Sequence, residues 1–263
     1  MPTSNNTYNP DGSDLRNYQL KLLDLLSEFA RLCEENGITW WIDSGTLIGA
    51  MRHGGFIPWD DDLDVCVLRK DLPRIRKILL GSAKAPFAYK DMWVKGYTRL
   101  WPRFMDESCR IVRRDPVSGE PKEDFLWIDI LPLRPGSPKL KKLVDPLYGR
   151  CFRRIIGAID DGPVKRVLAD FLSPLAVLLA WTVSVEGRIF RRNSLMHDFG
   201  VPFYSVRRRE DIFPLGTVSF EGRSFPAPGN TDGYLRRIYG DYTQLPPEDQ
   251  RTGHEIISVH TDD

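Results

Sequence analysis

The 263-residue chain is predicted to be an α+β (α/β) protein in which helices cover a mixed β-sheet. Two observations predict this class. Hydrophobic residues switch between helical spacing and the period-two spacing of strands over the first 130 residues. The length also fits one large domain, or one domain with an appended lobe.

The first expected element is an amphipathic helix over residues 15–36. Apolar residues recur there at helical spacing, and Gly37 is typical of the position just after a helix. The Ser44-Gly45 turn is expected to open a second, short helix over 46–52. The further elements expected are strands over 38–42 and 62–68, a helix over 71–80 and strands over 87–95, 97–104, 108–114 and 125–130.

Four carboxylates fall within five residues, at Asp60, Asp61, Asp62 and Asp64. In a strand, Asp62 and Asp64 project from the same face, Asp61 points the other way and Asp60 sits at the strand entrance. Carboxylates this close repel one another unless a cation compensates them. Hard cations such as Mg²⁺ or Mn²⁺ take such oxygen ligands. The alternative is a solvated acidic turn.

A glycine-containing turn precedes this acidic run. Gly45 lets backbone N–H groups approach a phosphate closely, and Thr46 follows it at the start of the short helix. Arg52 and His53 add donors that suit the same ligand. Phosphate donors beside a carboxylate cluster indicate a metal-dependent phosphotransferase, with Asp62 and Asp64 as metal ligands.

The segment from Trp41 to Arg69 resembles the signature of the LicD family, within the nucleotidyltransferase-like superfamily. Gly45-Thr46-Leu47-Ile48-Gly49 is followed by Arg52-His53-Gly54-Gly55-Phe56-Ile57-Pro58-Trp59 and then by the aspartates. Ser44 departs from the family pattern, which often has a second glycine there. Further resemblances are Trp127-Ile128-Asp129-Ile130-Leu131-Pro132-Leu133, Phe220-Glu221-Gly222, Tyr239-Gly240-Asp241-Tyr242 and Leu245-Pro246-Pro247.

The resemblance gives Asp129 a role. A carboxylate on an otherwise apolar strand needs a partner, and a structural salt bridge is one explanation. The resemblance implies instead a third metal ligand, beside Asp62 and Asp64, or a base that activates the acceptor hydroxyl. Asp60 is the other candidate for that base.

The resemblance also implies the reaction. We expect a CDP-activated alcohol as donor, a glycan or glycolipid hydroxyl as acceptor, and CMP as leaving group. The product would be, for example, phosphocholine on a teichoic acid or lipopolysaccharide. Alternatives are transfer of ribitol phosphate, glycerol phosphate or a sugar phosphate, true nucleotidyl transfer, and a non-catalytic metal-binding or glycan-binding module.

Four segments are expected along the chain. Residues 1–13 form a flexible tail and 14–136 the nucleotidyltransferase-like core. Residues 137–200 form a basic helical lobe, and 201–263 complete the catalytic domain. The last segment is expected to contain a hairpin about Glu221-Gly222 and a helix ending at Tyr239. Tyr234, Arg236, Arg237 and Tyr239 could bind a nucleotide or simply pack, and His254 is a weak ligand candidate.

The apolar run 167–185 is flanked by arginines and lysines. Asp170, Ser173 and Pro174 argue against a simple membrane span. The run then forms either a helical lobe with a buried face or an amphipathic surface on anionic lipid.

The net charge of +1 does not favour nucleic-acid binding. Four scattered cysteines lack metal-ligand spacing, and the polar N-terminus does not resemble a signal peptide. We therefore expect a cytoplasmic protein with reduced thiols and Cys66 as a small core residue, and the hypothesis that follows from the basic lobe is a peripheral position at the inner face of the membrane.

Overall fold

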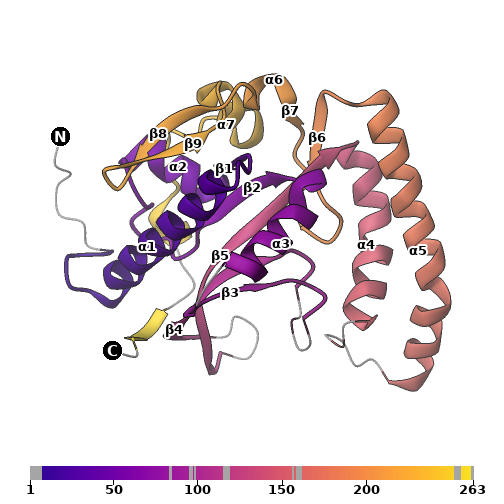
Figure 1. Ribbon diagram of the computed structural model, residues 1–263, viewed down its shortest axis with the longest axis horizontal. Coiled ribbons are helices and arrows are strands. Elements are labelled where there is room, and N and C mark those ends of the chain that lie inside the picture. Colours follow the sequence, from indigo (N-terminus) through magenta and orange to yellow (C-terminus); the bar gives the residue numbers. More distant parts are fainter. Residues whose placement is uncertain are drawn as a thin grey trace.

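The computed structural model describes residues 8–82, 85–94, 97, 99–114, 119–155, 157, 162–251 and 256–261. Within this part of the chain, an eight-stranded mixed sheet is flanked by helices, as Figure 1 shows, and the predicted α+β class is confirmed. The path through the sheet is β1-β2-β5-β4-β10, with β3 on β4, β6 on β5 and β7 on β6. These strands are β1 (Trp40–Ile42), β2 (Asp64–Leu68), β3 (Phe87–Lys90), β4 (Arg103–Arg114), β5 (Pro121–Pro135), β6 (Ser194–His197), β7 (Arg207–Arg208) and β10 (Ile256–Thr261).

Helix α1 (Asp14–Glu35) lies across one face of the sheet. The Ser13 hydroxyl accepts a hydrogen bond from the Arg16 N–H at its start, and Gly37 follows its end with φ 59°. Its apolar stripe includes Phe29, whose ring lies 5.9 Å from that of Phe104 on β4. This face forms the main core, so the catalytic candidates must lie on the opposite face or at the ends of strands.

The sheet brings distant segments of the chain together through one parallel pair. Strands β2 and β5 run parallel, and every other pair among the described strands is antiparallel. In that pair Asp64 is the direct neighbour of Asp129. A separation of 65 positions in sequence therefore becomes a side-by-side placement on one face.

Strand β4 differs from the expectation. The predicted strands 97–104 and 108–114 are instead one strand that begins only at Arg103. Its register on β5 shifts between Asp106 and Arg110. The Asp106 carboxylate accepts hydrogen bonds from the N–H and hydroxyl of Ser108 there, which bridges the irregularity without ending the strand.

The C-terminal part packs on the end of the sheet near β1. The predicted hairpin is confirmed as β8 (Gly216–Phe220) and β9 (Arg223–Ala227), and the predicted helix as α7 (Thr231–Tyr239). Glu221 in the hairpin turn pairs with Arg16 of α1 at 2.8 Å and accepts from the Phe56 N–H at 3.1 Å. The remaining elements are α2 (Ser44–His53), α3 (Leu72–Ser82), α6 (Arg209–Ile212) and the short 3-10 helices Arg69–Asp71 and Glu248–Gln250.

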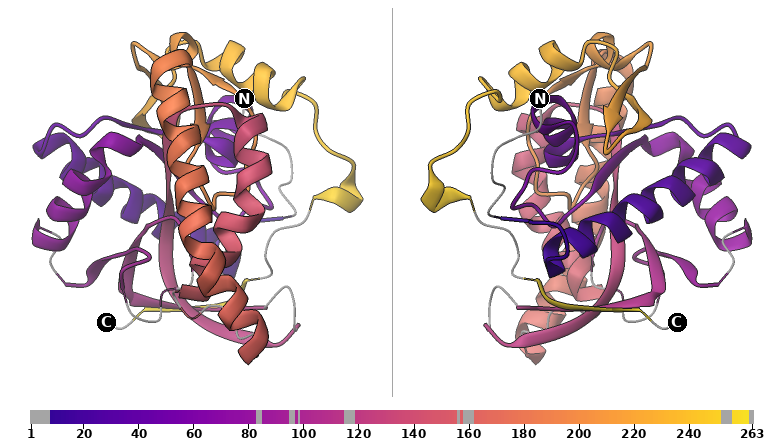
Figure 2. Two further views of the ribbon diagram at one scale, coloured as in Figure 1. Left: turned by 90° about the vertical axis from the view of Figure 1, so that its right-hand side faces the viewer. Right: turned by 90° about the vertical axis from the view of Figure 1, so that its left-hand side faces the viewer.

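Two long helices stand beside the sheet, α4 (Pro138–Ile155) and α5 (Pro163–Phe190). The left panel of Figure 2 shows them side by side. They share a small core of Val144, Ala180 and Val183 with Met196 and Phe199. Within α5, Asp170–Phe190 is long and apolar enough to cross a membrane by length and composition alone, which is weak evidence of a span.

Candidate active site

Four charged residues form one row across the sheet. The register pairs Lys90 of β3 with Arg103 of β4, Arg103 with Asp129 of β5, and Asp129 with Asp64 of β2. Directly paired residues share a face of the sheet, so this row runs from two cations to two carboxylates. Asp62 lies just before β2, at the acidic end of the row.

The carboxylates at this end influence one another electrostatically. Burial, followed by the charges of Asp62 and Asp129, raises the pKa of Asp64 well above its usual value. Burial, followed by the charges of Asp62 and Asp61, does the same to the pKa of Asp60. The structure thus brings Asp60, Asp62, Asp64 and Asp129 together, as a shared cation would require.

Asp129 is held by two donors on Oδ1. The Arg103 Nε donates at 2.7 Å and the Trp101 Nε1 at 2.9 Å. The salt bridge that would explain Asp129 structurally is therefore present. It fixes the carboxylate beside Asp64 without excluding a role in binding a cation.

The N-terminal turn of α2 lies against the acidic cluster. A Cβ on Gly45 would come within 2.8 Å of the Asp60 Oδ2, so only glycine fits there without displacing that carboxylate. Thr46 is buried, and its hydroxyl accepts a hydrogen bond from the Asp64 N–H at 2.9 Å. The Thr46 side chain thus positions the start of β2. The first N–H groups of α2 remain the predicted donors to a phosphate.

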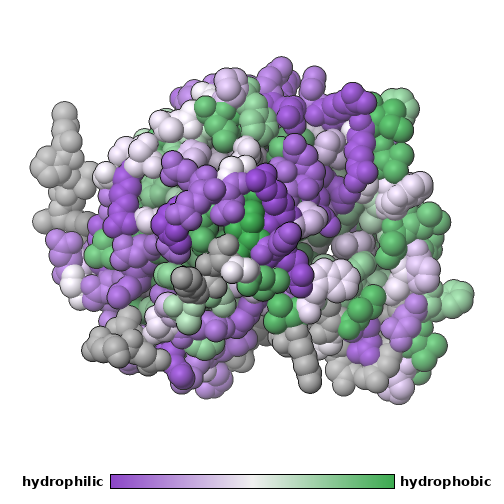
Figure 3. Space-filling view, in the orientation of Figure 1, coloured by the Kyte–Doolittle hydropathy of each residue, from purple (hydrophilic) through white to green (hydrophobic). Residues whose placement is uncertain are grey.

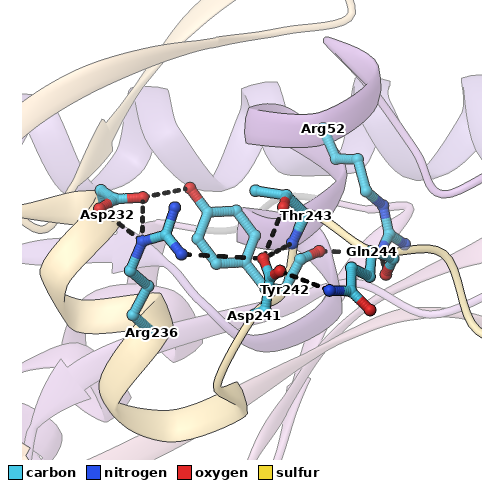
Figure 4. A network of polar contacts seen from close by, with 7 residues as sticks. All are labelled: Arg52, Asp232, Arg236, Asp241, Tyr242, Thr243 and Gln244. Atoms are coloured by element: carbon cyan, nitrogen blue, oxygen red, sulfur yellow. Dashed lines mark hydrogen bonds and ion pairs between the residues drawn. The ribbon is translucent and has the colours of Figure 1, made fainter.

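Arg52 and His53 lie at the other end of α2. The Arg52 guanidinium donates to the carbonyls of Tyr242 and Gln244, which ties the helix to the C-terminal loop (Figure 4). Its Nε donates to the His53 Nε2 at 2.9 Å. Burial and the Arg52 charge lower the pKa of His53 to about 4, so the imidazole is neutral near pH 7. Their role as phosphate ligands remains a prediction.

Carboxylate oxygens are the ligands that a hard divalent cation takes, but among the described residues the group whose ligand atoms lie close enough together for one ion is Asp43, Cys66 and His197. The candidate ligands Asp62, Asp64 and Asp129 come from two adjacent strand positions and one preceding loop, and burial, followed by the neighbouring negative charges, raises the pKa of Asp64. The role of Asp62, Asp64 and Asp129 as metal ligands stays a prediction. The cluster is therefore compatible with the expected Mg²⁺ or Mn²⁺ without identifying the metal.

A second polar centre lies in the core next to β2. The Asp43 carboxylate accepts from Tyr234 Oη at 2.7 Å, Cys66 Sγ at 3.0 Å and Arg207 at 3.3 Å. His197 is close enough for Asp43, Cys66 and His197 to hold a metal geometrically. The Arg207 charge already compensates Asp43, so we interpret this centre as a structural ion pair.

Sequence reasoning missed this ion pair because its two charges are 164 residues apart. A partial signal was available, since Asp43 follows a strand of three apolar residues and must be compensated when buried. Cys66 is a buried core residue, as predicted.

The other nucleotide candidates in α7 contact protein atoms. Tyr234 is buried on Asp43, and Arg237 pairs with Asp211 at 2.8 Å. Arg236 pairs with Asp232, which also accepts from the Tyr242 hydroxyl (Figure 4). These contacts agree with packing rather than ligand binding. His254 lies outside the described residues.

Comparison with known proteins agrees with this geometry. Residues 37–135 match the family model described as LicD/FKTN/FKRP, nucleotidyltransferase domain. The lipopolysaccharide cholinephosphotransferase LicD of Haemophilus influenzae is 29% identical over 94% of this chain and 97% of its own length. The ribitol 5-phosphate transferase FKRP of Homo sapiens is 41% identical over 54 residues, which are 19% of this chain and 11% of FKRP.

The mixed sheet, the glycine turn and the carboxylate cluster define a protein of the nucleotidyltransferase-like class. Within that class, residues 37–135 match the nucleotidyltransferase domain of the LicD family. The matched segment 37–135 contains β1, α2, β2 and all of β5, and so includes all four candidate carboxylates.

Proposed function

We propose that this protein moves a phospho-alcohol group, such as phosphocholine, from a CDP-activated donor to a hydroxyl of a cell-surface glycan or glycolipid and releases CMP. Homology to a LicD transferase over nearly the whole chain supports a phosphotransferase enzyme. The observation that carries the proposal is the direct pairing of Asp64 with Asp129 beside Asp62.

The proposed step is a displacement at phosphorus. The acceptor hydroxyl oxygen bonds to the phosphorus that carries the alcohol, and the bond from that phosphorus to the CMP oxygen breaks. Asp129 or Asp60 takes the hydroxyl proton as base. The first N–H groups of α2, at Gly45 and Thr46, bind phosphate oxygens of the donor.

Asp62, Asp64 and Asp129 would hold Mg²⁺ or Mn²⁺. When bound, such an ion neutralises negative charge on the phosphate oxygens and aligns donor and acceptor. If Asp129 serves as a metal ligand, the role of base falls to Asp60, whose carboxylate lies against Gly45.

A donor panel tests the proposal. Purified protein is given CDP-choline, CDP-ribitol, CDP-glycerol or CDP-ethanolamine, with Mg²⁺ and with EDTA, and released CMP is measured. Metal-dependent CMP release from one donor supports the proposal and identifies the transferred group. Transfer of the nucleotide instead, seen in the mass of the product, would favour a true nucleotidyltransferase. Absence of release, with and without a glycan acceptor, would contradict the proposal and favour a non-catalytic module.

We also propose that the α5 surface contacts an anionic membrane, where a lipid-linked acceptor would lie. Phe171, Leu175 and Leu178 follow one another at helical spacing and are exposed, as is Trp181. Figure 3 shows apolar residues gathered along this side of the molecule. Exposed cations at Arg188, Arg191 and Arg192 end the helix, and they complement anionic lipid.

Vesicle flotation tests this contact. Vesicles rich in phosphatidylglycerol are expected to carry the protein at low salt, and Trp181→Ser with Phe171→Ser is expected to weaken binding. Trp93→Ser is the matched control, because Trp93 is also an exposed tryptophan but lies outside α5. No binding at low salt would contradict the contact. So would a dimer in the absence of lipid that the α5 substitutions abolish, since a second copy would then cover this face.

A further inference from the structure

A cavity of about 590 Å³ opens beside the row of charged residues formed by Lys90, Arg103, Asp129 and Asp64. Strands β3, β4 and β5 and residues around Tyr97 line it. Arg103 belongs both to this lining and to the row, where it contacts Asp129. The cavity therefore adjoins the candidate carboxylates through Arg103, and Lys90 is a second member of the row that lines it.

The lining of this cavity is strongly cationic. Six basic side chains face two acidic ones, Glu123 and Asp124. Burial, followed by the charge of Arg103, lowers the pKa of Arg99, which shows how closely the cations crowd. A cavity with this imbalance attracts anions. The basic residues are Lys90, Arg99, Arg103, Arg110, Arg113 and Lys122.

Arg113 shows that the site is preorganised. Its side chain is buried, with 8% of the residue exposed, and its Nε has no hydrogen-bond partner among the described residues. A carboxylate oxygen of Asp124 is 3.9 Å from its Nη2. A buried guanidinium N–H without an acceptor is costly, and a ligand oxygen in the cavity would supply the acceptor.

Trp127 supports the two buried arginines. The guanidinium carbon of Arg103 lies 4.0 Å and that of Arg113 5.0 Å from the centre of its ring. Stacking on an aromatic ring fixes the plane of a guanidinium and so leaves less freedom to lose on binding. Planar forks held in this way suit phosphate oxygens, which arginine binds through two parallel hydrogen bonds.

We propose that this basic cavity binds phosphate groups of a substrate of the adjacent active site. The inference rests on the proposed function. Two sources have the same chemistry: the diphosphate of the nucleotide donor, or a phosphate on the acceptor glycan. Either would lie within reach of Arg103 and hence of the carboxylate row.

Calorimetric binding to the whole protein tests this proposal with two probes, CDP and glucose 6-phosphate, each in Mg²⁺ and in EDTA. Arg113→Gln removes the buried guanidinium. Arg110→Gln removes an exposed cation from the same cavity and keeps the test valid if the first variant fails to fold. Arg114→Gln is the matched control, because this exposed neighbour is not part of the lining.

About a tenfold weaker affinity is expected for both cavity variants, because each loses one charge-assisted contact. The affinity of Arg114→Gln is expected to be unchanged. An effect on CDP assigns the cavity to the donor, and an effect on glucose 6-phosphate assigns it to the acceptor. Wild-type affinity for both probes in both cavity variants, or no binding of either probe to the wild-type protein, would overturn the proposal.

Failure of the proposed function looks different. A protein that binds these anions through Arg113 and Arg110 but releases no CMP from any donor would retain the cavity and refute the transfer reaction. A protein that releases CMP with unchanged KM in both cavity variants would retain the reaction and refute the cavity.

Discussion

Asp64 of β2 and Asp129 of β5 are direct neighbours in the parallel pair of the sheet. The Asp129 N–H also donates to the Leu63 carbonyl at 3.0 Å, which locks the register just where the two carboxylates meet. Rigid strands therefore place both groups on one face, and neither relies on a loop for its position. This relationship is the basis for the predictions about the site.

Divalent cations should stabilise the protein. Burial, followed by repulsion from neighbouring carboxylates, raises the pKa of Asp60 and Asp64, so a bound cation relieves a cost that the protein otherwise carries. At a hundredfold excess over Kd, Mg²⁺ should add about 2.7 kcal/mol to the free energy of unfolding. Thermal unfolding with Mg²⁺ or EDTA measures this, and Asp64→Asn should abolish the difference.

The metal effect should also depend on pH. Since the folded-state pKa of Asp64 is raised, protons compete with the cation as the pH falls. The Mg²⁺-induced shift in Tm should therefore be larger at pH 8 than at pH 6. An equal shift at both pH values would contradict a carboxylate site.

Removing Arg207 should destabilise the fold strongly. Arg207→Met leaves Asp43 buried without its cation, which should cost about 3–5 kcal/mol of unfolding free energy. Urea denaturation measures the loss. Arg208→Met, at the exposed next residue, should change stability by less than about 1 kcal/mol. Similar losses of unfolding free energy in the two variants would show that the Arg207–Asp43 pair contributes no more to stability than an exposed ion pair.

His197 should make stability pH-dependent. Burial, then the charges of Arg207 and Lys141, lowers its pKa well below the ordinary value of about 6.5. Below about pH 6.5 this histidine binds a proton in the unfolded chain but not in the folded one. The free energy of unfolding therefore falls as the pH falls, by up to about 1.4 kcal/mol per pH unit. Above that pH, both states are neutral and the effect vanishes.

The measurement compares unfolding free energies of wild type and His197→Phe between pH 5 and 8. Phenylalanine keeps the ring that contacts Phe203. The variant should lose part of the slope, whereas His260→Phe, at an exposed position, should retain it. An identical slope in His197→Phe would mean that this histidine is not the responsible group.

Gly45→Ala should reduce activity more than stability. The added methyl would lie 2.8 Å from the Asp60 Oδ2 and would push that carboxylate out of the cluster. We expect about a tenfold lower turnover, by analogy with misplaced catalytic groups. Gly81→Ala, where the methyl meets open space, should leave turnover unchanged. Full activity in Gly45→Ala would contradict the assignment of Gly45 to the active site.

Local patterns in the sequence predicted much of the fold. The ends of α1, the hairpin at Glu221 and the helix ending at Tyr239 depend on short-range signals, and all three are confirmed. The length of β4 was not predictable in this way, because the strand continues across its irregularity through pairing with β5, whose register shifts between Asp106 and Arg110.

Only the part of the site that is local in sequence was predictable. Asp60, Asp62 and Asp64 are close in sequence, so their grouping follows from the chain itself. The partnership of Asp43 with Arg207, and the gathering of cations from Lys90 to Lys122, depend on strand order and register. No spacing rule in a single sequence contains that information.

Turnover of the donor selected by the panel, in wild type, Asp64→Asn and Asp129→Asn, tests the central claim most directly. Both substitutions keep the size of the side chain, so thermal unfolding should show an intact fold. CMP release should fall more than about 100-fold in each, beyond the cost typical of losing an outer-shell partner of a metal. Asp71→Asn, beyond the end of β2, should keep the wild-type rate. Wild-type turnover in either Asp64→Asn or Asp129→Asn would contradict the assignment of the paired carboxylates as the reacting centre.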